Sequence, residues 1–184
     1  MRRVRYGVGM SLDGYIAGPA GGLDFLVSDP SYDQGAFFAS IDTILMGRRT
    51  YEAALRHGAG GFPGLRAYVF SRTLRPADHP EVTVVASGAA EVVAGLRAEG
   101  EGKDIWLAGG GGLLASLLAA GVVDTVEVGI SPVLLGQAGV PLLAPAPPLP
   151  CPVRLELTRS QAYPSGLLIA EYAVRAANAG EGVA

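Results

Sequence analysis

The sequence is poor in the residues that mark several well-known classes of protein. Its single cysteine, Cys151, cannot form an internal disulfide or a C-x-x-C metal site. Only two histidines are present, and His57 and His79 both lie in loop-like surroundings. The chain also has no G-x-S-x-G or H-E-x-x-H pattern, so the parts of a serine hydrolase or a zinc enzyme are missing. We therefore expect no metal site.

Excess positive charge and long apolar runs are missing as well. Lys+Arg 14 against Asp+Glu 17 gives a net charge of −3, without the basic excess that drives binding to a phosphate backbone. A membrane-spanning helix needs about 20 apolar residues. The two uncharged runs, 105–123 and 129–153, are broken by four consecutive glycines and by seven prolines. We expect a cytoplasmic protein with no nucleic-acid or membrane partner.

What is present suits one compact α/β domain. The chain has 184 residues, of which 49% are hydrophobic and 17% charged, and domains commonly have about 100 to 200 residues. Short apolar runs alternate with segments of helical spacing, which predicts a mostly parallel sheet with helices on both faces. The predicted strands are 4–10, 43–46, 67–70, 82–85, 105–108 and 122–130, and the predicted helices are 33–41, 91–99, 113–120 and one that begins at Gly47.

The last third of the chain has a different pattern. Residues 153–160 and 167–175 read as a hairpin that turns at Pro164-Ser165-Gly166. This C-terminal antiparallel hairpin is expected to close one edge of the sheet. We expect residues 1–175 to form the single domain and residues 176–184 to be a flexible tail.

Residues that directly follow a strand are the most informative, because ligands of open α/β sheets bind beyond the carboxyl ends of the strands. Met46-Gly47-Arg48-Arg49-Thr50 combines a strand end with a helix start that Thr50 could cap, and two arginines could hold a phosphate there. The alternative is an ordinary helix start with solvated arginines. Ser71-Arg72 follows another strand and, taken alone, is a turn.

Two further segments follow strands. The glycines Gly109–Gly112 would let backbone amides approach a pyrophosphate, and Gly110, Gly112 and Ala115 match G-x-G-x-x-A, a pattern with many accidental matches. Asp13-Gly14 is either a simple tight turn or the source of a carboxylate that faces a pocket. Phe37-Phe38, at helical spacing, is interpreted as core.

Taken together and in order, these segments resemble the dihydrofolate reductase-like superfamily, and most closely the reductase domain of bifunctional riboflavin biosynthesis proteins. The motifs are Ser-Leu-Asp-Gly-Tyr-Ile-Ala at 11–17, Met-Gly-Arg-Arg-Thr-Tyr-Glu at 46–52, Phe-Ser-Arg-Thr-Leu at 70–74, the four glycines, and Ile130–Gly136. The resemblance covers residues 3–175. It implies a three-layer Rossmann-like fold, an NADPH-dependent reductase, and a homodimer formed through the apolar strand 122–130.

The resemblance also implies roles for individual residues at the coenzyme. Gly47, Arg48, Arg49 and Thr50 would lie at the adenosine phosphates, with Arg48 facing the 2′-phosphate, while Ser71 and Arg72 would flank the adenine and that same phosphate. The pyrophosphate would be covered by Gly109, Gly110, Gly111, Gly112, Leu113 and Leu114, and the nicotinamide would lie near Ile16 and Ala17.

The substrate side is less defined by the resemblance. Asp13 matches the motif of the riboflavin branch in which the aspartate lies by the substrate, and Asp33, or else Asp29, matches the acid that lines the pterin pocket of dihydrofolate enzymes. The H-x-E and P-C-x-x-C pattern of the fused zinc deaminase is absent, which implies a stand-alone reductase. The expected substrate is a small pterin- or ribosylaminopyrimidine-like heterocycle. The alternatives are a non-catalytic dinucleotide-binding module and a scaffold that only dimerises.

Overall fold

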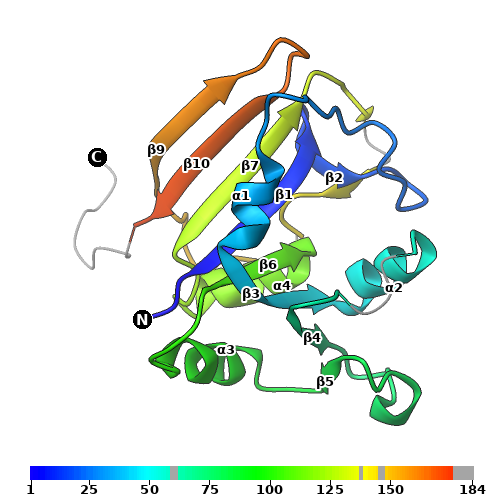
Figure 1. Cartoon of the computed structure of the whole chain (residues 1–184), viewed down its shortest axis with the longest axis vertical. Coiled ribbons are helices and arrows are strands. Elements are labelled where there is room, and N and C mark those ends of the chain that lie inside the picture. The colour runs from blue at the N-terminus through cyan, green and yellow to red at the C-terminus, as the bar shows by residue number, and fades with distance from the viewer. Residues whose placement is uncertain (59–61, 137–138, 145–147, 176–184) are drawn as a thin grey trace.

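A computed structural model of the chain describes residues 1–58, 62–136, 139–144 and 148–175. Its main feature is an eight-stranded sheet with the order β5-β4-β3-β6-β1-β7-β10-β9 (Figure 1). The pairs from β5 to β7 are parallel, and β10 and β9 add an antiparallel hairpin. The fold prediction is therefore confirmed. The strands are β1 (Val4–Ser11), β3 (Ile41–Gly47), β4 (Arg66–Phe70), β5 (Thr83–Val85), β6 (Asp104–Gly109), β7 (Thr125–Ser131), β9 (Leu155–Ala162) and β10 (Leu168–Val174).

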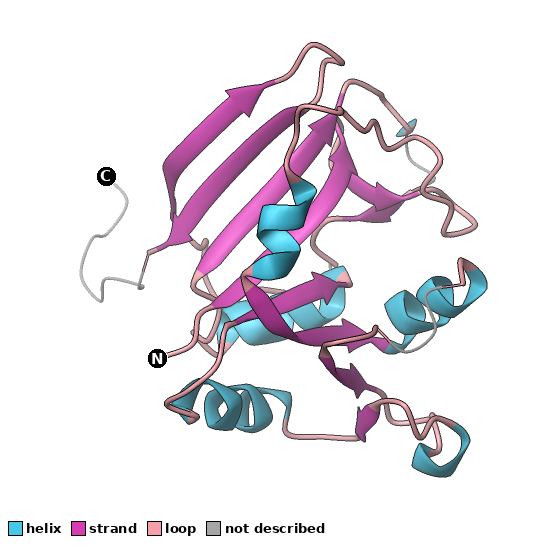
Figure 2. Cartoon of the chain, in the orientation of Figure 1, coloured by secondary structure: helices cyan, strands magenta, loops and turns pink. Residues whose placement is uncertain are grey.

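Helices cover both faces of the sheet, as Figures 1 and 2 show. They are α1 (Gln34–Ala39), α2 (Arg48–Arg56), α3 (Ala89–Ala98) and α4 (Gly111–Ala119), with a short 3₁₀ turn at Pro76–Asp78. Alternate residues of β3 face opposite ways: Leu45 packs in the core with α3 and α4, whereas Ile44 and Met46 pack with α2. This alternation follows from the period of two in a strand, and it produces the predicted three layers.

Some boundaries differ from the prediction. Tyr15–Ala17 (β2) and Val140–Pro141 (β8) form a small antiparallel sheet that was not predicted, because strands this short have no visible period. β7 starts at Thr125 and not at Val122, whose amide still bonds to the α4 carbonyl of Leu117. Both edges of β7 are already paired, so they cannot hold a second copy.

Two expectations concern the C-terminal tail and the absence of a membrane-spanning helix. The predicted tail, residues 176–184, lies outside the described residues. In the part that is described, no helix has the length and apolar character needed to cross a bilayer.

The sheet opens between its two central strands. β1 pairs with β7 from Arg5 to its end at Ser11, but with β6 only from Val4 to Tyr6. Beyond this point β6 bulges and stays with β3. The segment Gly7–Gly9 of β1 therefore borders a gap in the sheet, and two cavities meet at this segment.

Candidate functional site

A cavity of about 1210 Å³ lies at the carboxyl edge of the parallel strands. It is bounded by the ends of β3, β4 and β6, by the first turns of α2 and α4, and by the small β2–β8 sheet. Most of the residues that the family resemblance assigned to a coenzyme come together here: Ile16, Ala17, Gly47, Arg48, Arg49, Thr50, Arg72, Gly110, Gly111, Gly112 and Leu113.

Two helices begin at this cavity with unused N–H groups. The N-cap residues are Gly47 for α2 and Gly110 for α4, and neither helix has a side-chain cap or an acidic residue in its first turn. Thr50 lies inside α2, so the prediction that it caps the helix is wrong. Free N–H groups and the helix dipole together favour an anion at each of these two positions.

The glycines after β6 serve different purposes. Gly109 has φ +121°, a conformation that favours glycine, and Gly110 is the N-cap of α4. A Cβ on Gly111 would lie 2.6 Å from the amide nitrogen of Ala144, whereas the nearest atom to a Cβ on Gly112 would be 4.0 Å away. The predicted four-glycine loop is thus a strand end followed by the first turn of a helix.

The charged side chains that line this cavity are mainly cationic. Arg48 is about two-fifths exposed and forms an ion pair with Glu52 at 2.9 Å. Arg49, Arg56 and Arg72 also line the cavity, and none of them has an ion pair among the described residues. Charged donors of this kind bind phosphate oxygens strongly. The electrostatic character of the cavity therefore suits a ligand with several phosphates.

Three residues expected at the coenzyme do not line this cavity. The hydroxyl oxygen of Ser71 accepts bonds from the amides of Thr73 and Leu74, at 3.2 and 3.1 Å, so its side chain caps a turn. Leu114 is buried in the core, and Gly109 lies between two residues that line the cavity, Ala108 and Gly110, without lining it itself.

A second, smaller cavity of about 330 Å³ lies on the other side of the gap in the sheet. It shares Gly7, Val8, Gly9, Leu26 and Trp106 with the first cavity. We call the two cavities the large and the small chamber. The common wall means that a ligand in one chamber can lie next to a ligand in the other.

Aromatic side chains form much of the small chamber. Phe37 and Phe38 of α1 each meet Trp106 edge to face, with ring centroids 5.6 and 5.5 Å apart. The indole nitrogen of Trp106 donates to the Gly7 carbonyl at 2.8 Å. The interpretation of Phe37-Phe38 as core is therefore wrong: α1 has no buried residue, Phe38 is 42% exposed, and both rings line the small chamber.

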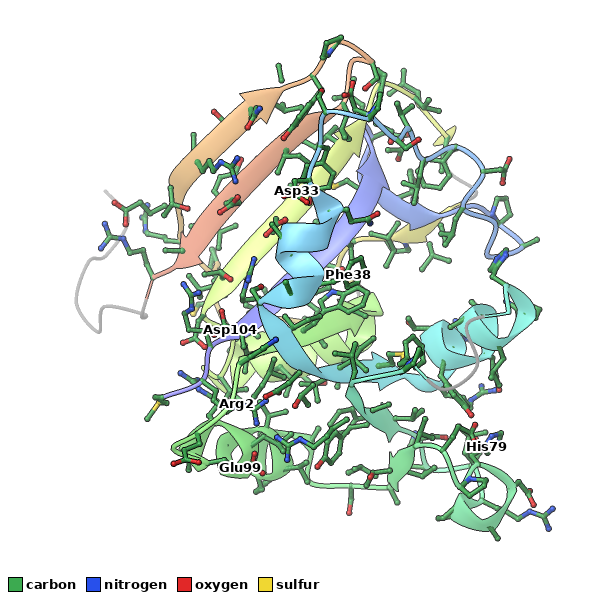
Figure 3. The ribbon with its side chains drawn as sticks, viewed as in Figure 1. Arg2, Asp33, Phe38, His79, Glu99 and Asp104 are labelled. Carbon is green, nitrogen blue, oxygen red and sulfur yellow. The ribbon has the colours of Figure 1, made fainter. Side chains whose placement is uncertain are left out.

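The structure places the carboxylates of Asp13 and Asp33 away from both chambers. Asp13 accepts bonds from the Ser11 hydroxyl and from the amides of Leu135 and Gly136, and these bonds together lower the pKa of its carboxyl although desolvation opposes them. Asp33 accepts from the Ala36 amide at 3.0 Å and caps α1, at whose N-terminal end Figure 3 shows it. Asp33 therefore stabilises the start of α1, and Asp13 joins the turn after β1 to the loop after β7.

Two other carboxylates, Asp29 and Glu127, line the small chamber. Asp29 is buried and accepts from the hydroxyl and amide of Ser31 and from the amide of Ser165, bonds that hold its pKa well below the usual range. Glu127 accepts from Arg5 at 3.1 Å and from the Tyr32 hydroxyl at 3.3 Å. Burial, and then the charge of Glu127, raise the pKa of Tyr32 to about 12. The hydroxyl of Tyr32 is therefore a stable donor.

Sequence reasoning missed Glu127, Trp106 and Tyr32, and it gave Asp29 only as an alternative. Glu127 lies in a strand, where alternation shows that side chains face opposite ways but not what each face meets. Trp106 lies in the strand that ends at the glycines, which was the one available signal. Asp29 and Tyr32 lie in a loop whose path no period describes.

Comparisons with known proteins agree with this geometry. The model of the RibD C-terminal domain family matches residues 2–169. An uncharacterized protein of Bacillus subtilis, YyaP, is 29% identical over 185 residues, covering 91% of this chain and 92% of its own. The crystal structure of a putative riboflavin biosynthesis protein from Shewanella sp. PV-4 superimposes with a TM-score of 0.79 at 26% identity, covering 95% of this chain and 99% of that one. A diaminohydroxyphosphoribosylaminopyrimidine deaminase/5-amino-6-(5-phosphoribosylamino)uracil reductase from Thermotoga maritima shares the fold at 15% identity and a TM-score of 0.67, with 95% of this chain covering 57% of that one.

Proposed function

Because the chain belongs to the RibD C-terminal domain family, with its reductase-like fold, we propose that it is an NADPH-dependent reductase of a small heterocyclic substrate. The observation that supports this most is the pairing of the two chambers. A large cation-lined cavity with two free helix N-termini meets a small aromatic, acidic cavity across the gap between β1 and β6. Such an arrangement suits a phosphate-rich coenzyme beside a planar substrate.

The residues of the large chamber fit the chemistry of NADPH. The first-turn N–H groups of α4, at Gly111 and Gly112, would hold the pyrophosphate, and those of α2 would hold a phosphate of the adenosine end. Arg48 and Arg72 would bind the 2′-phosphate. Gly7–Gly9 and Trp106 form the wall common to both chambers, where the nicotinamide would have to lie to reach a substrate.

When bound, NADPH supplies a hydride from its C4 to the carbon of a C=N or C=O group, a proton joins the heteroatom, and NADP⁺ remains. The protein's part is to hold the two rings together and to exclude water. Trp106, Phe37 and Phe38 offer apolar ring surfaces for the substrate, while Tyr32 and Glu127 form a hydrogen-bonded pair beside them. A proton donor or an N–H acceptor is thus available in the small chamber.

The preference for NADPH over NADH tests the assignment of the large chamber. We expect NADPH to bind more tightly than NADH. Arg72→Ala should reduce the ratio of the NADH to the NADPH dissociation constant by about 10- to 100-fold, which is the effect of losing a hydrogen bond to a charged group. Both dissociation constants can be measured from the fluorescence of the bound reduced coenzyme. Arg75→Ala is the matched control, because Arg75 is exposed and pairs with Asp78 outside the chamber. Equal affinities for the two coenzymes would refute the assignment.

The main alternative is a module that binds a dinucleotide without catalysis. Screening pterins, ribosylaminopyrimidines and small carbonyl compounds for loss of NADPH absorbance separates the two. Tight coenzyme binding without oxidation by any compound would favour the module.

The expected homodimer is a further proposal, and any edge-to-edge contact would need β5 or β9, the outer strands of the sheet. Sedimentation of a monomer at micromolar concentration would remove it.

A further inference from the structure

Resting on this proposed function, we propose that the small chamber selects unphosphorylated, planar heterocycles that donate N–H groups and are neutral or cationic. Glu127 is the residue that determines this selection. The proposal concerns the substrate and is separate from the coenzyme, which would occupy the large chamber.

The size and walls of the small chamber fit a flat ring system. At about 330 Å³ it stands at the lower end of the range for small-molecule sites, which suits one or two fused rings. Apolar contacts come from Leu26, Val27, Leu167 and Ile169, and aromatic contacts come from α1 and Trp106. Rings are held well by such surfaces, whereas a long charged substituent would find few partners there.

The charges of the small chamber are opposite to those of the large one. Its lining contains two carboxylates, Asp29 and Glu127, and among the described residues no lysine, arginine or histidine. Arg5 contacts two residues of the lining without lining the chamber itself: its guanidinium bonds to Glu127 and to the Ser40 hydroxyl and lies 4.8 Å from the centre of the Phe37 ring. A phosphate in this chamber would face two negative groups with no free cation lining it, and burial makes such repulsion costly.

Glu127 has more open acceptor capacity than Asp29. One oxygen of Asp29 accepts both the hydroxyl and the amide of Ser31, and the other accepts the Ser165 amide. One oxygen of Glu127 takes the Arg5 guanidinium, and the other receives only the Tyr32 hydroxyl at a long 3.3 Å. A carboxylate oxygen can accept two bonds, so this oxygen can also take an N–H group of a bound ring.

Glu171 provides a close comparison for Glu127. It lies opposite Glu127 on the neighbouring strand β10, so both side chains are on the same face of the sheet. Glu171 pairs with Arg159 at 2.9 Å and does not line the small chamber. The two glutamates therefore differ in access to the chamber more than in charge or strand position.

The test uses Trp106, the only tryptophan of the chain, as a fluorescent reporter of the common wall. The full-length protein, with and without saturating NADP⁺, is titrated with four probes: 2,4-diaminopyrimidine, orotate, uridine and uridine 5′-phosphate. We expect 2,4-diaminopyrimidine to bind more tightly than the anionic orotate, and uridine more tightly than its phosphate. Glu127→Gln should weaken 2,4-diaminopyrimidine by about 10- to 100-fold, while Glu171→Gln leaves its affinity unchanged.

Each result supports or overturns the proposal. The proposal is overturned if orotate binds as tightly as 2,4-diaminopyrimidine, or if uridine 5′-phosphate binds as tightly as uridine. It is also overturned if Glu127→Gln leaves the affinity for 2,4-diaminopyrimidine unchanged, or if no probe binds. Thermal unfolding of both glutamine variants shows whether a loss of affinity comes from a damaged fold. Because the ring probes are also titrated without coenzyme, a failure of coenzyme binding would count against the proposed reductase and leave the charge selection of the small chamber measurable.

Discussion

Gly111 offers the sharpest test of the site's construction. Replacing it with alanine places a Cβ 2.6 Å from the Ala144 amide nitrogen, 2.8 Å from the Leu142 carbonyl oxygen and 3.0 Å from the Leu143 carbonyl carbon. All three are backbone atoms, so a side-chain rotation cannot relieve the contact. Overpacking of this kind costs about 1 to 3 kcal/mol, reduced by the roughly 0.5 to 1 kcal/mol that alanine gains over glycine in a helix. We expect Gly111→Ala to lower the free energy of unfolding by about 1 to 2 kcal/mol.

Gly112, the next residue of α4, is the matched control. A Cβ there would meet its nearest atom, the Cβ of Ala144, at 4.0 Å. Gly112→Ala should therefore raise the free energy of unfolding by up to about 1 kcal/mol. Because Gly112 also lines the large chamber, the same variant should bind NADPH more weakly. Urea denaturation and coenzyme titration measure the two effects, and equal stability of Gly111→Ala and Gly112→Ala would refute the reasoning.

Two further predictions concern stability away from the chambers. Arg2 is buried and bonds to Asp42, Glu99 and the Lys103 carbonyl, and Figure 3 shows it beside Glu99. Arg2→Ala should lower the free energy of unfolding, measured by urea denaturation, by about 3 kcal/mol. This is the lower end for a broken buried ion pair, because both acids are partly exposed. A loss below about 1 kcal/mol would count against the prediction. Asp29 has a lowered pKa in the folded protein, so its contribution is present above about pH 4 and disappears as the pH falls through the folded pKa. The stability difference between wild type and Asp29→Asn should therefore shrink below about pH 4, and a difference independent of pH would exclude this linkage.

The parts of the site that could be predicted are those fixed by strand ends. β3 and β6 show short apolar runs that stop at glycine, and Gly47 and Gly110 are the N-caps of the following helices. Parallel strands end at one edge of a sheet, so locating the strands was enough to bring Arg48, Arg72 and the glycines together. The physical reason is that these positions depend on backbone direction alone.

The acidic side of the site could not be predicted in the same way. Asp33 caps α1 by accepting the Ala36 amide, and Asp13 accepts the amides of Leu135 and Gly136 from the loop after β7. Carboxylates occupied in this way by backbone amides are less available for another role. Glu127 and Asp29 reach the small chamber through the register of β7 and through the path of the loop before α1. Both depend on tertiary packing, which a period of two or of 3.6 residues does not encode.

The two chambers meet because the central pair of strands separates. At Ala108 β6 bulges against β3, with Leu45 opposite Leu107 but Met46 opposite Gly109, and a bulge bends its strand. β1 continues instead with β7, and its Gly7 carbonyl, without a partner on β6, accepts the indole N–H of Trp106. A side chain of the departing strand thus replaces a ladder bond and places its ring at the wall common to both chambers. The cationic large chamber and the acidic small chamber consequently meet where β1 and β6 separate. The indole of Trp106 lines both chambers, so its fluorescence can report on a ligand in either one.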